Sequence, residues 1–348
     1  MKNQKFRIGI VGCGKISTNH FNAIQELSDQ FELLSICDKN ADNLNAVVNK
    51  LNIQGFPDID TMIAAKPELD ILTLCTPSGM HAEQTKRIAQ FKKHVITEKP
   101  MATRWSDGVE MVNACDQANV KLFVVKQNRN QGALQLLKRA ITKNRFGRIY
   151  LANFNIFWTR PQSYYDQSKW RGTWEFDGGA FMNQASHYVD LLDWLMGPVQ
   201  SVQSMMSTLS INMQAEDTGV LNIRWRSGTL GSMNVTMLTY PKNLEASLTI
   251  LGEKGTVKIG GVSANQIEHW EFDTKDAEED VKAEQLKSPP ELSAHFNHKI
   301  YYQNVYDTLC GKASADTDGR DGLRSLEILI AAYLSARDNK NISLPLVY

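Results

Sequence analysis

Short apolar runs alternate with helical stretches over the first third of the chain. The runs are too short for helices, and several are apolar on both faces, as in strands of a parallel sheet that is covered on both sides. These runs are 6–11, 31–37, 69–75, 94–97 and 121–125. Between the first two, Ile16, His20, Ala23, Ile24 and Leu27 recur at helical spacing. The order predicts a doubly wound α/β domain with right-handed crossovers, over residues 1–126.

The pattern becomes β-rich in the rest of the chain, which we assign to a second, α+β domain of residues 127–348. After a predicted helix at 131–142, the predicted strands are 149–158, 199–209, 218–226, 229–238, 244–251 and 255–260. Turns such as Ser227-Gly228 and Glu253-Lys254 predict a large, mostly antiparallel sheet. Further helices are predicted at 179–196, 294–309 and 319–336. The charged stretch 273–291 is interpreted as a solvated excursion.

Composition narrows the choice of partners. The 348 residues are enough for about two domains, and 38 basic side chains balance 38 acidic ones. This balance argues against nucleic acid or a membrane surface as a partner and favours small molecules. The five cysteines form no CxxC pair, and no secretion signal or membrane span is visible, so we expect a cytoplasmic protein.

A glycine-rich turn follows the first apolar run. In Gly12-Cys13-Gly14-Lys15-Ile16-Ser17, the first glycine permits a tight turn and the second lets the backbone approach a pyrophosphate. The N–H groups at the start of the next helix would face that anion. Ser17 stands where the dinucleotide-binding fingerprint has its third glycine, and it is still small enough for close packing.

Two further strand ends point to the same cofactor. Asp38 follows the second strand, 24 residues after Gly14, where a carboxylate can accept hydrogen bonds from ribose hydroxyls and repel a 2′-phosphate. This position favours NAD over NADP, with the neighbouring Lys39 as a reservation; the alternative is that Asp38 caps a helix starting near Ala41. The loop Thr76-Pro77-Ser78-Gly79-Met80-His81 should also border the cofactor, although His81 could simply begin a helix.

Candidate chemistry comes from a lysine and a histidine. Lys99 lies between a strand end and Pro100, where it can orient a substrate hydroxyl; the alternative is a surface lysine at a turn. Asn183 and His187 lie four residues apart in the helix that begins at Gly179, and His187 is either a general base or a structural histidine.

Metal and nucleophilic chemistry find little support. No Cys or His cluster has zinc spacing, and His295 and His298 lack nearby partners, so we predict no metal site. The sequence also has no GxSxG elbow.

Together these residues resemble the Gfo/Idh/MocA family of oxidoreductases. The likeness runs through Gly12-Cys13-Gly14, Asp38, Thr76-Pro77, Glu98-Lys99-Pro100 and the glycine-led helix with Asn183 and His187. It implies a Rossmann domain joined to an open antiparallel sheet, oxidation or reduction of sugar and cyclitol carbinols, and Lys99 with His187 as the catalytic pair. The family usually has an aspartate where this chain has Asn183.

A closer likeness lies in residues 157–184, which resemble bacterial dehydrogenases of UDP-N-acetyl-2-amino-2-deoxyglucuronate. That group oxidises the sugar C3 hydroxyl on the way to a diacetamido mannuronic acid of surface polysaccharide (O-antigen, lipopolysaccharide). The likeness implies a tightly held NAD, which 2-oxoglutarate regenerates in place in some relatives, and a homotetramer packed through the open sheet faces. A free sugar or cyclitol dehydrogenase and a non-catalytic NAD-binding regulator are the alternatives.

The predicted binding residues follow from this likeness and from charge. A uronate and a diphosphate carry about three negative charges, so the pocket needs fixed guanidinium and hydroxyl donors, for which the candidates are Arg160, Arg171, Tyr164, Tyr165 and Gln184. The predicted substrate-binding residues are Lys99, Arg160, Tyr164, Tyr165, Asn183, Gln184 and His187. The predicted cofactor-binding residues are Gly12, Cys13, Gly14, Lys15, Ile16, Asp38, Thr76, Pro77, His81, Glu98, Lys99, Gln127, Trp170 and Arg171. Of Trp158, Trp170 and Trp174, we assign at least two to core packing, and Trp170 is the one that could border the nicotinamide.

Overall fold

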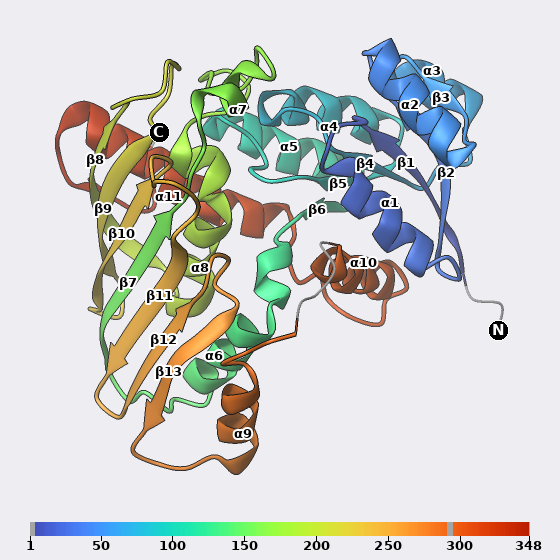
Figure 1. Cartoon of the computed structure of the whole chain (residues 1–348). Helices are drawn as coiled ribbons and strands as arrows, with labels where there is room; N and C mark the ends of the chain where they lie inside the picture. Colours follow the sequence, from blue (N-terminus) through green and yellow to red (C-terminus); the bar gives the residue numbers. More distant parts are fainter. Residues whose placement is uncertain (1–3, 291–294, 348) are drawn as a thin grey trace. The chain divides into compact units, whose positions relative to one another are not determined.

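The computed structural model describes residues 4–290 and 295–347, and this part of the chain divides into two compact units (Figure 1). The first unit takes in the chain up to Gln127 and also a late segment, with α10 (Phe296–Leu309), that continues to Leu323. The second unit begins at Asn128 and includes the chain from Arg324 onward. The sequence pattern places the first domain within residues 1–126 and gives no sign of the late segment.

The first unit contains a six-stranded sheet in the order β3-β2-β1-β4-β5-β6, in which all adjacent pairs are parallel. The strands are β1 (Phe6–Val11), β2 (Phe31–Cys37), β3 (Gly55–Phe56), β4 (Ile71–Leu74), β5 (His94–Thr97) and β6 (Leu122–Val124). The strand order reverses direction between β1 and β4. In such sheets, ligands bind beyond the carboxyl ends of the strands at this point. The predicted doubly wound domain is confirmed.

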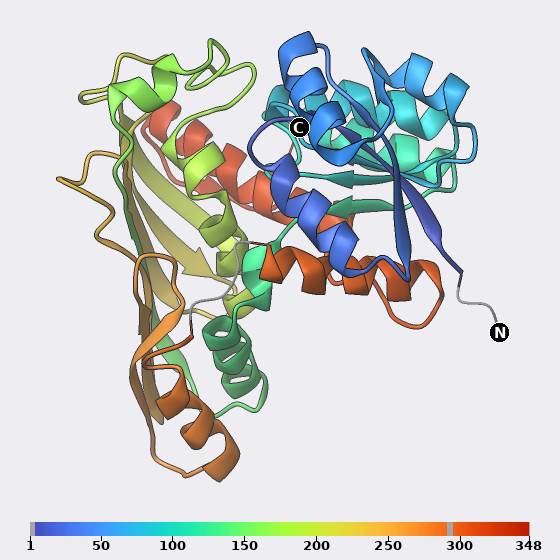
Figure 2. The same ribbon diagram turned by 45° about the vertical axis from the view of Figure 1, so that its right-hand side comes forward.

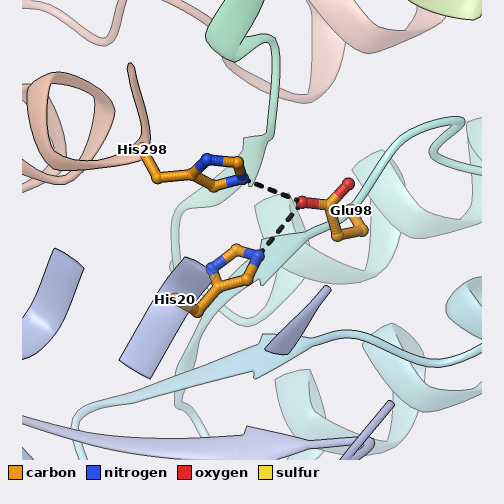
Figure 3. A group of neighbouring side chains, drawn as sticks. All are labelled: His20, Glu98 and His298. Carbon is orange, nitrogen blue, oxygen red and sulfur yellow. Dashed lines mark hydrogen bonds and ion pairs between the residues drawn. The ribbon is translucent and has the colours of Figure 1, made fainter. Parts of the chain in front are cut away.

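Helices α1 and α10 share one core with the sheet of the first unit. Tyr302 and Tyr306 of α10 pack edge-on against Phe31 with ring centroids 5.5 and 5.8 Å apart, so the late segment completes a core begun by β1 and β2. The same two helices bring His20 and His298 to Glu98, just beyond β5 (Figure 3). The helices of this unit are α1 (Ser17–Glu26), α2 (Ala41–Leu51), α3 (Ile59–Ala65), α4 (His81–Gln90), α5 (Trp105–Gln117) and α10, with short 3-10 turns at Ser78–Met80 and Gln127–Asn130. Ala294, where the pattern starts α10, lies outside the described residues.

The second unit contains an eight-stranded sheet in the order β13-β12-β11-β7-β10-β9-β8-β14. Only β7 and β10 pair in parallel among the described strands, so the predicted mostly antiparallel sheet is confirmed. The strands are β7 (Ile149–Phe157), β8 (Val199–Ser207), β9 (Thr218–Trp225), β10 (Leu230–Thr236), β11 (Glu245–Gly252), β12 (Gly255–Gly260), β13 (Gln266–Phe272) and β14 (Ile342–Ser343). The sequence pattern missed β13 and β14.

Within the described part of the chain, helices gather on one face of this sheet and none covers the other face (Figures 1 and 2). Alternate residues of β7 on the covered face, Ala152, Phe154 and Ile156, are fully buried. On the opposite face, Asn155 donates to Asn153 and accepts from Asn234 of β10, both at 2.9 Å. The helices of this unit are α6 (Gly132–Thr142), α7 (Gln162–Asp166), α8 (Ser186–Met196) and α9 (Ala277–Gln285), while α11 (Gly319–Asp338) begins in the first unit and ends in the second. No helix among the described residues is long and apolar enough to cross a membrane.

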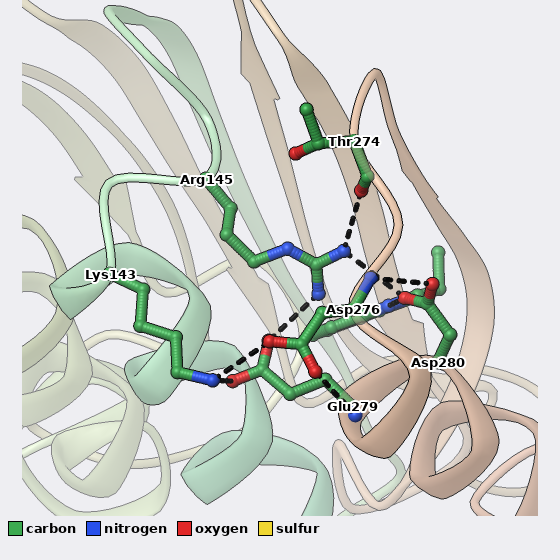
Figure 4. A network of polar contacts seen from close by, with 7 residues as sticks. Lys143, Arg145, Thr274, Asp276, Glu279 and Asp280 are labelled. Carbon is green, nitrogen blue, oxygen red and sulfur yellow. Dashed lines mark hydrogen bonds and ion pairs between the residues drawn. The ribbon is translucent and has the colours of Figure 1, made fainter.

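The interpretation of 273–291 as a solvated excursion holds for most of the residues up to 290, which are exposed, but not for the buried face of α9; Glu291 lies outside the described residues. The stretch contains α9, in which Glu279 is only 2% exposed. The guanidinium of Arg145 lies 2.7 Å from Glu279 and 3.1 Å from Asp280, and it donates to the carbonyl of Thr274 (Figure 4). The charges predicted to face water are therefore partly paired inside the fold.

Candidate active site

The glycine turn after β1 has the geometry that a dinucleotide requires. Gly12 has φ +97°, and a Cβ there would lie 2.8 Å from the carbonyl carbon and oxygen of Cys75, so only glycine fits. At Gly14 a Cβ would meet nothing within 4 Å, which leaves open space above the turn. Ser17 is buried and its hydroxyl donates to the carbonyl of Gly14 at 2.6 Å, so the residue that replaces the third glycine braces the turn. The turn fits the pyrophosphate of NAD.

Asp38 connects the end of β2 to this turn. Its carboxylate accepts the N–H of Cys13 and the N–H of Asn40, each at 2.8 Å. The residue that caps α2 is Asn40, so the alternative interpretation of Asp38 as the helix cap is wrong. Each carboxylate oxygen keeps a further acceptor site, as ribose recognition requires.

His81 connects the loop after β4 to the segment after β5. It is fully buried as the first residue of α4, and burial lowers the pKa of its imidazole. Nε2 lies 2.9 Å from the carbonyl of Thr76, and Nδ1 lies 3.1 Å from the carbonyl of Pro100. A neutral ring carries one N–H, so one of these two carbonyls accepts it at a time. Both ring nitrogens thus face the main chain.

Glu98 and Lys99 follow β5 directly. Lys99 is half-buried and precedes a cis peptide bond to Pro100. The carboxylate of Glu98, by contrast, is 6% exposed and turns into the first unit, where it meets His20 and His298. The sequence-based view that His298 lacks partners is wrong, because those partners are distant in the sequence; His295 contacts Glu26 instead, at 2.6 Å. That Glu98 binds the cofactor stays a prediction.

The glycine-led helix of the second unit is broken into two pieces. Residues Ala180–Gln184 form a π-helical turn, and α8 begins at Ser186. The predicted continuous helix, with Asn183 and His187 one turn apart, is therefore wrong. π-helical turns are frequent at functional sites. Both glycines before the turn are required by contact: a Cβ at Gly178 would lie 2.4 Å from Cβ of Met182, and one at Gly179 would lie 2.1 Å from the carboxylate of Glu216.

Glu216 is a residue of this site that sequence reasoning missed. Its main-chain carbonyl accepts the N–H of Ala180, and its Oε1 accepts the N–H of Phe181 and the hydroxyl of Tyr333. Burial raises its pKa from 4.5 to about 7. It therefore caps the π-helical turn with a carboxyl group that titrates near neutrality. In the sequence, Glu216 appears only as an acidic residue before a strand, and nothing in that position indicates that it caps the π-helical turn.

Arginine, tyrosine and glutamine side chains meet beside the π-helical turn. Gln184 accepts from Nε of Arg160 at 3.1 Å and donates to the hydroxyl of Tyr164 at 3.0 Å. Arg171 donates to the same hydroxyl at 2.5 Å and lies over the Tyr164 ring, 4.2 Å from its centroid. The structure thus brings together four predicted substrate or cofactor residues, while Tyr165 packs beneath them, buried. A cavity of about 280 Å³ adjoins the cluster and is lined by Tyr165, Asp166, Ser168, Lys169, Arg171 and Asn212.

The three tryptophans are not core residues, so their assignment to core packing is wrong. Trp174 is 50% exposed, and Trp158 and Trp170 are half-buried. Trp158 lies edge-on to Tyr188 and under the guanidinium of Arg160, and Trp170 lies under Arg171. Two of the three therefore support the arginines of the cluster.

The first unit contains the glycine turn and Asp38, and the second contains an open sheet. These features define a two-domain, dinucleotide-dependent oxidoreductase. The chain belongs to the GFO/IDH/MocA oxidoreductase family: the family's NAD-binding Rossmann-fold domain matches residues 6–126, and its C-terminal alpha/beta domain matches residues 138–344. NAD is therefore its cofactor.

Similar proteins have been solved with ligands. The chain is 55% identical to the WlbA dehydrogenase of Chromobacterium violaceum and 53% identical to that of Bordetella pertussis, each solved with NADH and UDP-GlcNAcA. Both matches cover 100% of this chain, and 98% and 100% of the other chain, with a TM-score of 0.95. The D-apiose dehydrogenase of Paraburkholderia graminis is 24% identical over 98% of this chain and 90% of its own length.

Proposed function

We propose that the protein oxidises the C3 hydroxyl of UDP-N-acetyl-2-amino-2-deoxy-D-glucuronate (UDP-GlcNAcA) to a ketone. The observation that carries this proposal is the likeness, at 53 and 55% identity over the whole chain, to two dehydrogenases that bind NADH and UDP-GlcNAcA. The Arg160, Tyr164, Arg171 and Gln184 cluster supports it, because the substrate carries both a carboxylate and a diphosphate.

Each predicted residue has a task in this reaction. Bound NAD supplies the hydride acceptor. The glycine turn from Gly12 to Ile16 and Asp38 hold the dinucleotide, with Thr76, Pro77, His81, Gln127 and Trp170 as further candidates. His187 takes the proton of the C3 hydroxyl, and Lys99 stabilises the alkoxide that develops as the C–H bond breaks. The opposite assignment, with Lys99 as the base, is the alternative.

Substrate recognition rests on guanidinium groups that are oriented before the ligand arrives. Arg171 is held by the hydroxyl and ring of Tyr164, and Arg160 by Gln184 and the ring of Trp158. Such pre-orientation reduces the entropy that ordering the side chains would cost on binding. Asn183 and Tyr165 complete the proposed sugar site.

The finer biological setting is part of the proposal. We expect a cytoplasmic homotetramer that serves surface polysaccharide synthesis and regenerates NAD in place by reducing 2-oxoglutarate. The face of the second sheet that carries no helix, with its row of asparagines, supports packing between copies of the chain. Sedimentation of the purified protein tests the assembly.

Mass spectrometry of the products tests the reaction. The purified protein is incubated with UDP-GlcNAcA and 2-oxoglutarate, and we expect a 3-keto sugar and 2-hydroxyglutarate. Free inositol and glucose serve as competing substrates, and a clear preference for either would contradict the proposal in favour of a cyclitol or free-sugar dehydrogenase.

Two variants test the catalytic pair. Lys99→Ala and His187→Ala should keep NAD bound and lower turnover by about 10²- to 10⁴-fold, as the loss of a proton-transfer group does. Near-normal rates in both variants would show that the assignment is wrong.

A further inference from the structure

A buried carboxylate lies directly next to the proposed catalytic lysine. Oε1 of Glu98 is 3.0 Å from Nε2 of His20 and 3.5 Å from Nε2 of His298 (Figure 3). Oε2 accepts the peptide N–H of Lys99 at 3.1 Å. His20 is fully buried, and His298 is 1% exposed. Three elements, α1, the end of β5 and α10, therefore meet at one carboxyl group.

The hydrogen bonds around Glu98 form a chain with a defined direction. Burial lowers the pKa of His20 more than its hydrogen bond to Glu98 raises it, so its imidazole is neutral near pH 7. Burial alone would raise the pKa of Glu98, but the hydrogen bond from His20 and the contact with His298 hold it well below its usual value. The neutral ring then donates from Nε2 to Glu98 and accepts at Nδ1 from the hydroxyl of Tyr302, 2.9 Å away. The hydroxyl of Thr73 lies 3.1 Å from the same Tyr302 hydroxyl.

The carboxylate of Glu98 contacts the main chain of the next residue as well as the two histidines. A buried anion costs free energy that an apolar side chain of the same volume would avoid. One of its two oxygens nevertheless accepts the peptide N–H of Lys99. The backbone of Lys99 is thus held at its own N–H by Glu98, and the carbonyl of Pro100, one residue on, lies 3.1 Å from Nδ1 of His81.

We propose that Glu98 is a positioning residue: its carboxylate, oriented by His20 and Tyr302, fixes the peptide of Lys99 and thereby aims the lysine ammonium at the substrate oxygen. This inference rests on the proposed role of Lys99. A shift of about 1 Å in a catalytic group can lower the rate of the chemical step by about 100-fold. The effect should therefore fall on kcat rather than on substrate binding.

A double-mutant cycle on the full-length protein tests this relationship. Glu98→Ala should lower kcat by about 10- to 100-fold and change KM by less than about threefold. Glu98→Gln should recover most of the rate, because its amide oxygen can accept the Lys99 N–H and its amide N–H can donate to His20 once that ring changes tautomer. In the Lys99→Ala background, Glu98→Ala should have no further effect on kcat.

Two further variants complete the design. Tyr302→Phe removes only the hydroxyl that orients His20 and should lower kcat a few-fold. If Glu98→Ala does not fold, Tyr302→Phe replaces it in the double-mutant cycle. Glu110→Ala is the matched control, since Glu110 is an exposed carboxylate that pairs with Lys86. It should leave kcat unchanged.

Three results would overturn the inference. The first is an equal loss from Glu98→Ala with and without Lys99, and the second is a Glu98→Gln variant as slow as Glu98→Ala. The third is one equivalent of transition metal in the purified protein that Glu98→Ala loses, because His20, Glu98 and His298 hold ligand atoms within 4.8 Å of one another. If the wild type does not oxidise UDP-GlcNAcA, the cycle is run on the alcohol that it does oxidise, so the failure of the proposed function is separate from the failure of this inference.

Discussion

The carboxylate of Asp177 accepts a hydrogen bond from the side-chain amide of Asn183 and a second one, of 2.6 Å, from the peptide N–H of Gly172. Asp177 is buried. An aspartate in place of Asn183 would put a second carboxylate against that of Asp177, and the two would repel one another. The side-chain amide of Asn183 therefore suits the buried carboxylate of Asp177, which needs a hydrogen-bond donor.

Asn183→Asp should be less stable than the wild type at pH 8. With aspartates at both 177 and 183, the two like charges raise the pKa of one of the two carboxyl groups. Keeping that group ionised at pH 8 therefore lowers the free energy of unfolding by about 1–3 kcal/mol. The loss should shrink as the pH falls through that raised pKa. Denaturant unfolding at pH 8 and pH 5.5 measures the change, with the exposed Asn45→Asp in α2 as the control. Equal losses at both pH values would contradict the prediction.

Glu216 should make the second unit less stable as the pH rises towards neutrality. Its pKa in the folded protein, about 7, exceeds the ordinary value of 4.5, so the folded state binds the proton more tightly. This contribution is complete below about pH 4.5 and is lost as the pH rises through about 7, with a size on the order of 3 kcal/mol. Glu216→Gln should abolish that dependence. Hydrogen exchange of the Ala180 and Phe181 amides measures this local stability as a function of pH. The same pH dependence of exchange in the Glu216→Gln variant and in the wild type would refute the prediction.

The two glycines of the turn after β1 should respond differently to alanine. Gly12→Ala forces a side chain onto the backbone at Cys75 and keeps a positive φ, so we expect a loss of about 1–3 kcal/mol in stability. Gly14→Ala meets no protein atom within 4 Å, so stability should hold while NAD affinity falls. Thermal unfolding and calorimetric titration with NAD separate the two effects. A stable Gly12→Ala protein would contradict the geometry.

Asp38→Asn should weaken the preference for NAD. The amide oxygen can still accept the N–H of Cys13, but the charge that repels a 2′-phosphate is gone. We expect the dissociation constant for NAD to rise and that for NADP to fall, which titration with both cofactors measures. Asp42→Asn, an exposed change in the first turn of α2, is the control and should alter neither.

Arg145 should matter far more to α9 than its neighbour Lys143 does. Arg145→Met leaves the buried carboxylate of Glu279 without its guanidinium partner, which should cost about 3 kcal/mol. Lys143 also contacts the Glu279 carboxylate, at 3.0 Å, but its side chain is 50% exposed, so Lys143→Met should cost much less. Hydrogen exchange in α9 compares the two, and equal protection in both variants would contradict the prediction.

The sequence predicted what depends on local pattern. Strands β1, β2 and β5 begin and end at the predicted residues, because each apolar run is bounded by turn-forming or polar residues. The glycine turn and Asp38 were visible for the same reason. Contacts across long stretches of chain were not visible: His298 meets Glu98, and Glu216 caps a turn at Ala180, through tertiary folding alone.

Charge and periodicity also misled in identifiable ways. The acidic run near Glu279 has the composition of a solvated segment, since its partner Arg145 is more than 100 residues away. The apolar spacing after Gly179 fits one helix, but the contact between the glycine backbone and Glu216 accompanies a π-helical turn before α8. Pattern alone cannot separate these cases.

The return of α10 to the first unit has a consequence for synthesis on the ribosome. Tyr302, Val305 and Tyr306 belong to the same core as Phe6 and Phe31, yet they are translated about 270 residues or more after those two. The nascent nucleotide-binding half must wait with that apolar surface uncovered until nearly the whole polypeptide has emerged. Truncation before residue 296 should therefore give an aggregating fragment rather than an independent dinucleotide-binding module.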